Sequence, residues 1–92
     1  MGRIAFERRL VRMPAGCERP YDESEWEDEL VVVVCGMIEL EGLSGRRWRF
    51  RRGSVIWLTD LPLRSLHNPT DEVTVLMTVA RPINSRPPNR PI

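Results

Sequence analysis

The run Leu30-Val-Val-Val-Val34 limits the folds open to this chain more than any other feature. These consecutive apolar, mostly β-branched residues are too few for a buried helix and suit a strand that is covered on both faces. Other short apolar segments follow at fairly even spacing, separated by glycine, proline and asparagine turns, and no helical period is sustained. The sequence therefore predicts an all-β barrel or sandwich with this run as its central strand.

Further strands are predicted on both sides of the central run. They cover residues 4–13, 37–41, 46–52, 54–58 and 73–80, with glycine-rich residues 42–45 as a hairpin and 68–71 as a turn. Within 46–52, Trp48 and Phe50 share one face and arginines occupy the other, which is typical of a strand with one buried face. We favour this interpretation over nucleic-acid binding by interleaved arginine and aromatic residues, and expect no nucleic-acid partner.

The length of 92 residues allows one hydrophobic core. We assign residues 1–82 to a single domain and the proline-rich residues 83–92 to an extended or disordered tail. No apolar run approaches the ~20 residues that cross a bilayer, and Met1 to Pro14 carries scattered arginines instead of the apolar core of a secretory signal. With only two cysteines, which are too few for a disulfide scaffold, the sequence predicts a cytoplasmic protein without membrane contact.

Two spaced patterns carry a resemblance to a known superfamily. Glu29 and Gly36 reproduce the E(X)6G half of one motif, and Gly53 and Asn68 match the two ends of a second motif with the required spacing. With these residues the chain resembles the cupin superfamily over roughly residues 10–82. The resemblance implies a small cupin-type (jelly-roll) β-barrel that holds a small organic molecule in its interior.

The metal-binding histidines of the superfamily are replaced. In one register the first motif places them at Glu23 and Glu25; the other register places them at Asp22 and Ser24 and matches Gly16 instead. In the second motif the histidine position is Arg64. Because imidazole is the usual ligand for Zn, Fe, Ni and Cu, its loss predicts neither a transition metal nor another cofactor. His67 lies an odd number of residues from Arg64 and is expected on the opposite face, as a surface or loop histidine.

The replaced positions supply the candidate site. The even spacing of Glu23, Glu25 and Glu29 places them on one face of a continuous strand, where like charges raise one another's pKa unless a cation neutralises them. The resemblance brings Arg64 opposite Glu29, and we expect a buried ion pair in place of the metal. In a functional version these two are the catalytic residues: Arg64 orients an anionic or carbonyl ligand, and a carboxylate moves a proton.

The other candidates are ligand-binding residues. The motif positions and the aromatic side chains expected inside the barrel are Glu23, Glu25, Trp48, Phe50, Trp57 and Asn68. Three functions stay open: an accessory enzyme of small-molecule metabolism, a non-catalytic binding or sensing module, and an enzyme with Mg, Ca or Mn held by carboxylates.

The central strand also predicts a partner. With Glu29 pointing inward, Leu30, Val32 and Val34 point out of the barrel, and the sequence predicts no helix to cover them. Either the strand at residues 4–13 or a second subunit must bury this row. The resemblance favours the second, and we expect a homodimer.

Overall fold

The computed structural model describes residues 7–80, which form strands and one short helix. The elements in chain order are β1 (Glu7–Met13), β2 (Glu18–Pro20), α1 (Glu23–Trp26), β3 (Glu29–Cys35), β4 (Met37–Gly42), β5 (Arg47–Arg51), β6 (Val55–Trp57), β7 (Leu63–His67) and β8 (Thr74–Ala80). The expected all-β class is confirmed. Within these residues no helix is long and apolar enough to cross a membrane. The proline-rich tail lies outside the described residues.

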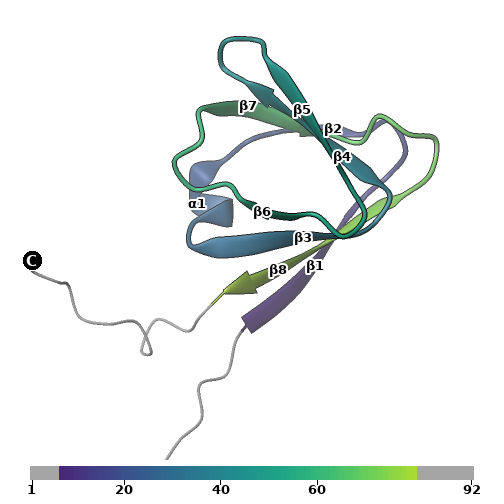
Figure 1. Ribbon diagram of the computed structural model, residues 1–92, viewed down its shortest axis with the longest axis horizontal. Helices are drawn as coiled ribbons and strands as arrows, with labels where there is room; N and C mark the ends of the chain where they lie inside the picture. The colour runs from purple at the N-terminus through teal and green to yellow at the C-terminus, as the bar shows by residue number, and fades with distance from the viewer. Residues whose placement is uncertain (1–6, 81–92) are drawn as a thin grey trace, which may run out of the picture.

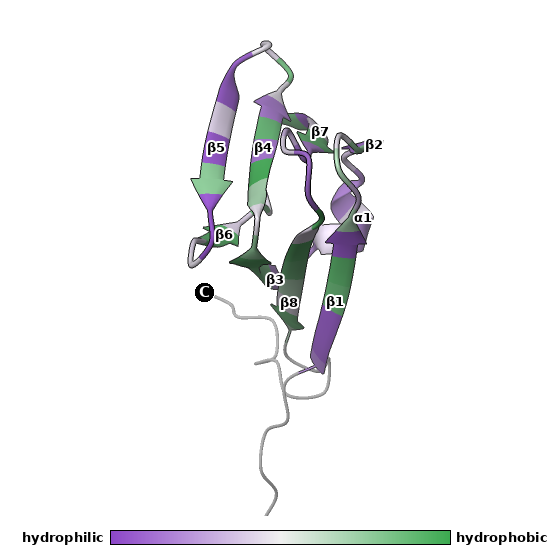
Figure 2. Ribbon diagram, turned by 90° about the vertical axis from the view of Figure 1, so that its right-hand side faces the viewer, coloured by the Kyte–Doolittle hydropathy of each residue, from purple (hydrophilic) through white to green (hydrophobic). Residues whose placement is uncertain are grey.

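The strands form two antiparallel four-stranded sheets. Sheet A has the order β1-β8-β3-β6, and sheet B has the order β2-β7-β4-β5. Figure 1 shows the sheets facing each other, with α1 between them at one side. In Figure 2 the exposed strand β5 is banded in purple and green, as the alternation in its sequence predicts, whereas β3 is green along most of its length. The arrangement is the small jelly-roll barrel that the sequence predicts.

β3 is the central strand of sheet A, as expected. It pairs with β8 on one side and β6 on the other. Val31 and Val33 are buried at 0% and 1% exposure, whereas Leu30 and Val34 are more than 40% exposed. The alternation confirms that Val31 and Val33 point into the core and Leu30 points out; after Val33 the register shifts, and Cys35 pairs with Val75.

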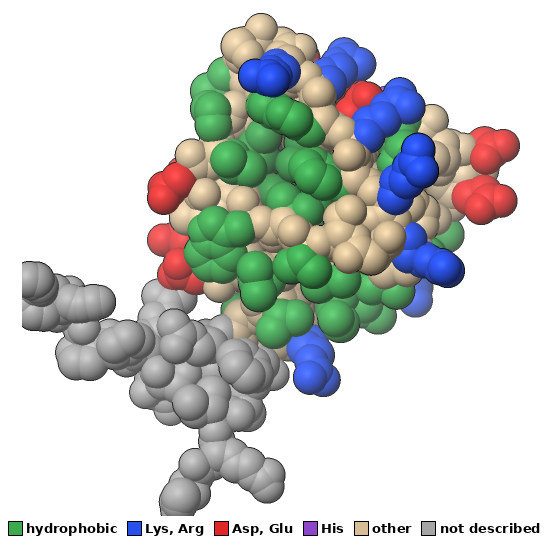
Figure 3. Space-filling model, viewed as in Figure 1, with side chains coloured by type: hydrophobic (Ala, Val, Ile, Leu, Met, Phe, Trp, Pro, Cys, Tyr) green, Lys and Arg blue, Asp and Glu red, His purple; other side chains and the backbone are tan. Residues whose placement is uncertain are grey.

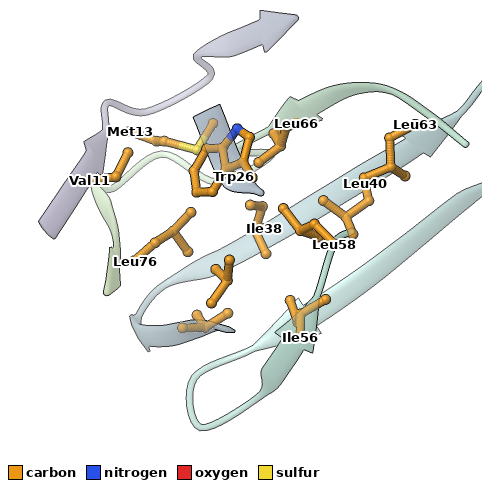
Figure 4. Close-up of a cluster of buried hydrophobic side chains, with 12 residues drawn as sticks. Val11, Met13, Trp26, Ile38, Leu40, Ile56, Leu58, Leu63, Leu66 and Leu76 are labelled. Carbon is orange, nitrogen blue, oxygen red and sulfur yellow. The ribbon is translucent and has the colours of Figure 1, made fainter. Parts of the chain in front are cut away.

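The core fills the space between the sheets. Both sheets and α1 contribute apolar side chains to it, and Figure 4 shows Trp26 of α1 against Met13 of β1. Trp26 and Met13 are both completely buried. The buried members are Val11, Met13, Trp26, Val31, Val33, Ile38, Leu40, Ile56, Leu58, Leu63, Leu66 and Leu76.

Gly36 takes the chain from sheet A to sheet B. Its φ of +86° lies in the left-handed region that favours glycine, and a Cβ there would collide with Thr74 of β8. The buried Thr74 hydroxyl accepts a hydrogen bond from the Met37 amide at 3.0 Å and donates one to the Met37 carbonyl at 2.8 Å. The corner therefore ties β8 of one sheet to β4 of the other.

Three elements were not expected from the sequence. β2 and β7 pair with each other at one side of sheet B. The prediction that Glu23, Glu25 and Glu29 lie on one continuous strand is wrong, because residues 23–26 form α1. Asp22 caps this helix with its side chain, which accepts a hydrogen bond from the Ser24 amide.

Candidate functional site

The acidic candidates divide between a part-buried cluster and the exposed surface. Glu29 opens β3, and its Oε1 accepts a hydrogen bond from Arg9 Nη2 at 2.8 Å. Glu25 binds Arg9 through one carboxylate oxygen at 3.4 Å and binds Arg19 through the same oxygen. Glu23 is exposed on α1. The structure thus joins Glu25 and Glu29 through arginines that the sequence reasoning missed, and leaves Glu23 outside.

Trp26 lies at the centre of this charged cluster. The guanidinium carbons of Arg9 and Arg19 lie 5.2 and 5.5 Å from the centroid of its ring, within the range of cation–π attraction. Arg9 comes from β1 in sheet A and Arg19 from β2 in sheet B, so the ring joins both sheets. Burial acts to lower the pKa of Arg9, but the hydrogen bonds and charges of Glu29 and Glu25 outweigh it and raise that pKa.

Arg64 does not face Glu29, and that expected ion pair is wrong. Its side chain is 56% exposed, lies 3.9 Å from Glu41, and donates a hydrogen bond to the Leu43 carbonyl. The cause is a β-bulge: Glu41 pairs with Ser65 and the next residue, Gly42, pairs with Leu63, which leaves Arg64 as the extra residue. A bulge breaks the strict alternation of side chains, so the motif position that the resemblance gives Arg64 does not lie inside the barrel.

The positions that match the histidines do not fit a metal. The two part-buried carboxylates, Glu25 and Glu29, already bind guanidinium groups, whose positive charge repels a cation. In the part of the chain that the structure describes, no group of three or more His, Cys, Asp or Glu side chains could hold a metal ion. The donor set fits neither the transition metal that the resemblance implies nor a hard cation held by three carboxylates.

An apolar pocket opens at the mouth of the barrel. Its walls are Leu40, Trp48, Phe50 and Leu61, and its volume is about 270 Å³. Figure 3 shows apolar side chains gathered in the hollow between the two sheets. Leu40 is buried, Trp48 and Phe50 are half-buried, and Leu61 is exposed at the rim. The structure thus places the predicted pair Trp48 and Phe50 together in one wall.

Gly42 allows the Trp48 ring to lie against β4. A Cβ at Gly42 would come within 3.2 Å of two atoms of that ring, closer than ordinary van der Waals contact. On the exposed side, the guanidinium carbon of Arg46 lies 5.5 Å from the ring centroid. One positive charge therefore stands beside the apolar pocket.

Two other ligand-binding candidates do not line this pocket. Trp57 points out of sheet A and is 47% exposed, because its neighbour Ile56 takes the inward position. Asn68 is completely buried, and its side-chain amide is saturated by the backbone and by Thr70. The prediction that Trp57 lines the barrel interior is wrong, because its side chain lies on the outer face of sheet A. The predicted ligand-binding role of Asn68 is also wrong, because its side chain holds a loop in place through hydrogen bonds.

A second charged cluster lies on the outer face of sheet B and was not predicted. Glu39 is 6% exposed and accepts hydrogen bonds from Arg49 at 2.9 Å and Arg47 at 3.5 Å. His67 Nδ1 lies 3.4 Å from the same carboxylate. The hydrogen bond from Arg49 lowers the pKa of Glu39, and the His67 contact adds to this against the opposing effect of burial. Arg47 and Arg49 of β5 thus pair with a carboxylate of their own sheet, on the face that the sequence predicts to be solvent-exposed.

Replacing Arg9 should cost more stability than replacing Arg64. Arg9→Met removes the partner of two part-buried carboxylates, and we expect it to lower the free energy of unfolding by about 2 kcal/mol, as for a hydrogen bond to a charged group. Arg64→Met removes only an exposed contact and should cost less than about 0.5 kcal/mol. Urea denaturation of both variants measures the difference; an equal loss would argue for a buried role of Arg64.

Comparison with known proteins gives structural similarities only. No protein-family model and no curated protein matches the sequence. A Cupin 2 conserved barrel domain protein from Salinispora arenicola CNS-205 superposes with a TM-score of 0.66 and 27% identity, over 80% of this chain and 60% of its own. The Cnp3 cupin domain of Schizosaccharomyces pombe gives 0.65 and 25%, over 84% and 53%. The chain thus spans somewhat over half the length of these two structures.

A third similar structure agrees in fold. A cupin domain from Bordetella pertussis Tohama I superposes with a TM-score of 0.60 over 89% of this chain and 85% of its own, at 20% identity. At that identity the similarity concerns the fold alone. All three structures share the barrel described above.

Proposed function

We propose that this chain, which belongs to the cupin superfamily, binds a small organic molecule at the mouth of its barrel as a non-catalytic binding or sensing module. The apolar pocket of Leu40, Trp48, Phe50 and Leu61 carries the proposal. Its volume of about 270 Å³ lies near the lower end of small-molecule sites, which range from roughly 300 to 1,000 Å³. The ligand is therefore small, and its buried part is apolar.

Arg46 defines the second feature of the ligand. Its guanidinium stands at the rim beside Trp48, where it can pair with an anionic group that stays in contact with water. A molecule with an apolar body and one carboxylate can contact the apolar walls and pair with Arg46 at the rim. We propose a small aliphatic or aromatic carboxylate as the ligand class.

Binding is favoured over catalysis by the position of the charged residues. A reaction driven by Glu29 and Arg64 needs both side chains beside the ligand. Glu29 is instead bound to Arg9, and the Arg64 side chain is exposed to solvent near Glu41. The walls of the apolar pocket supply no acid or base.

Octanoate and octanol are suitable probes, because they share an apolar chain and differ in charge. By titration calorimetry we expect Trp48→Ala to weaken octanoate binding about tenfold, the effect of losing roughly 1.4 kcal/mol of apolar contact. Trp57→Ala removes the same side chain from the outer face of sheet A and should leave the affinity unchanged.

The charge at the rim is tested separately. Arg46→Gln should weaken octanoate binding about two- to fivefold, as for a part-exposed ion pair, and leave octanol binding unchanged. Absence of octanoate and octanol binding to the unmodified protein, or equal binding by Trp48→Ala, would reject the pocket as the site.

A further inference from the structure

Strand β5 forms one edge of sheet B. Within residues 7–80 the order of the sheet ends at β5, which pairs with β4 on its other side. Figure 2 shows β5 at the outer margin of the sheet, next to β4. An edge strand presents a row of backbone amide and carbonyl groups to which another extended chain can add as a new strand. We call this row the β5 edge.

The register fixes which backbone groups point to the β5 edge. The Gly42 amide donates a hydrogen bond to the Arg46 carbonyl at 2.7 Å, so this pair is hydrogen-bonded. Hydrogen-bonded and non-hydrogen-bonded pairs alternate along an antiparallel ladder, so Trp48 is the next residue that bonds to β4. The amide and carbonyl groups of Arg47 and Arg49 therefore face away from β4, towards the open side.

The two faces of β5 differ in character beside this edge. Trp48 and Phe50 point inward and form part of the wall of the apolar pocket. Arg47 and Arg49 point outward, and their side chains are 59% and 61% exposed. Both guanidinium groups share the single carboxylate of Glu39. Positive charge is therefore in excess along the outer side of the edge.

A strand that adds to β5 alternates its side chains in step with those of β5. Its residue opposite Trp48 points inward, towards the pocket, where an apolar side chain fits. Its residues opposite Arg47 and Arg49 point outward, where carboxylates can pair with the guanidinium groups. The complementary sequence is therefore one in which acidic and apolar residues alternate.

Other occupants match the β5 edge less well. A second copy of β5 would bring two rows of arginines opposite each other, and like charges in that position are destabilising. Residues 81–92 of this chain contain four prolines and three arginines but no acid, so they offer few amide donors and the same charge. Nucleic acid would meet the arginines and the aromatic rings on opposite faces of one strand, where a single base cannot use both.

We propose that the β5 edge binds an extended peptide of alternating acidic and apolar residues through backbone hydrogen bonds to Arg47 and Arg49. The acidic side chains pair with these two guanidinium groups, and the apolar side chain between them contacts Trp48 at the pocket. The peptide shares this wall with the proposed small-molecule ligand. Its hydrogen bonds come from the backbone of β5, so the proposal does not rest on that ligand.

A fluorescein-labelled peptide, Gly-Glu-Val-Glu-Val-Glu-Gly, tests the proposal by fluorescence anisotropy. Lysine in place of glutamate should weaken binding at least about tenfold, because it reverses the charge that faces the arginines. N-methylation of the glutamates removes the amide hydrogens that point at β5 and should also weaken binding at least about tenfold. N-methylation of the valines, whose amides point away from β5, should change the affinity less than about threefold.

Protein variants and hydrogen exchange locate the peptide. Arg47→Gln should weaken its binding about two- to fivefold, as for an exposed ion pair, whereas Arg8→Gln, at an exposed arginine of β1 in sheet A, should not. By NMR, the bound peptide should slow exchange of the Arg47 and Arg49 amide hydrogens at least about tenfold. The Trp48 amide, which already bonds to β4, should change little.

Absence of saturable peptide binding up to about 1 mM would overturn the proposal, as would equal affinity for the peptides methylated at glutamate and at valine. An oligothymidine of about ten nucleotides that binds more tightly than the peptide would assign the arginines to nucleic acid and also overturn it. Octanoate calorimetry reports on the pocket separately. Octanoate binding without peptide binding would reject the β5 edge alone, and the reverse result would reject only the small-molecule function.

Discussion

Trp26→Ala should lower the free energy of unfolding by about 3–5 kcal/mol, a large part of the stability of a domain of this size. Trp26 is completely buried and lies in the core against residues of both sheets. Its loss leaves a cavity and also removes the ring on which Arg9 and Arg19 stack. Chemical denaturation followed by circular dichroism measures the change.

Trp26→Phe separates the effect of lost core volume from the effect of losing the aromatic ring on which Arg9 and Arg19 stack. The Nε1 atom of Trp26 has no hydrogen-bond partner among the described residues, so phenylalanine removes an unsatisfied group while it loses some volume. We expect a loss of about 1–2 kcal/mol for this variant. A cost below about 1 kcal/mol for Trp26→Ala would show that α1 does not close the core.

Asn68→Ala should cost about 3 kcal/mol or more. The Asn68 amide donates to the carbonyls of Met13, Pro14 and Glu72, and its oxygen accepts from the amide and hydroxyl of Thr70. Alanine leaves these groups without partners in a buried position, and each unsatisfied group costs about 1–3 kcal/mol. The side chain joins the end of β1 to the turn before β8, so its loss releases both. Urea denaturation at pH 7 measures the effect.

Asn68→Asp tests whether the hydrogen bonds that the Asn68 amide donates are the source of this stabilisation. Aspartate keeps the shape but presents negative charge to carbonyl oxygens, so this variant should be severely destabilised at pH 7. Protonation restores one donor, and the variant should lose less stability at pH 4, relative to the unmodified protein at the same pH. Asp71→Ala, an exposed change in the same turn, should have little effect. An unchanged denaturation midpoint for Asn68→Ala would show that the loop is held by other contacts.

The fold could be predicted because its signals are local. The β-branched run fixes β3, and the period of two fixes which side of it faces the core. The same period places Trp48 and Phe50 on the inner side of β5. The inward position of Arg9 could have been predicted in the same way, because it lies two and four residues before Val11 and Met13 on the same strand, and both of these are buried.

The charged site could not be predicted because it depends on breaks in the period. The capping side chain of Asp22 starts a single helical turn, which moves Glu25 from the expected strand face to a position between Arg9 and Arg19. A bulge removes Arg64 from the interior. Neither a four-residue helix nor a bulge leaves a pattern long enough to recognise in a single sequence.

The order of pairing in sheet A has a consequence for the newly made chain. Both neighbours of β3, which are β6 and β8, follow it in the sequence, and within residues 7–80 the partner of β1 is β8. Contacts between such distant segments form slowly, typically in milliseconds to seconds once the chain is free. During synthesis β3 therefore leaves the ribosome before both of its partners, and its valines are open to aggregation or to a chaperone until β8, which ends at Ala80, has emerged.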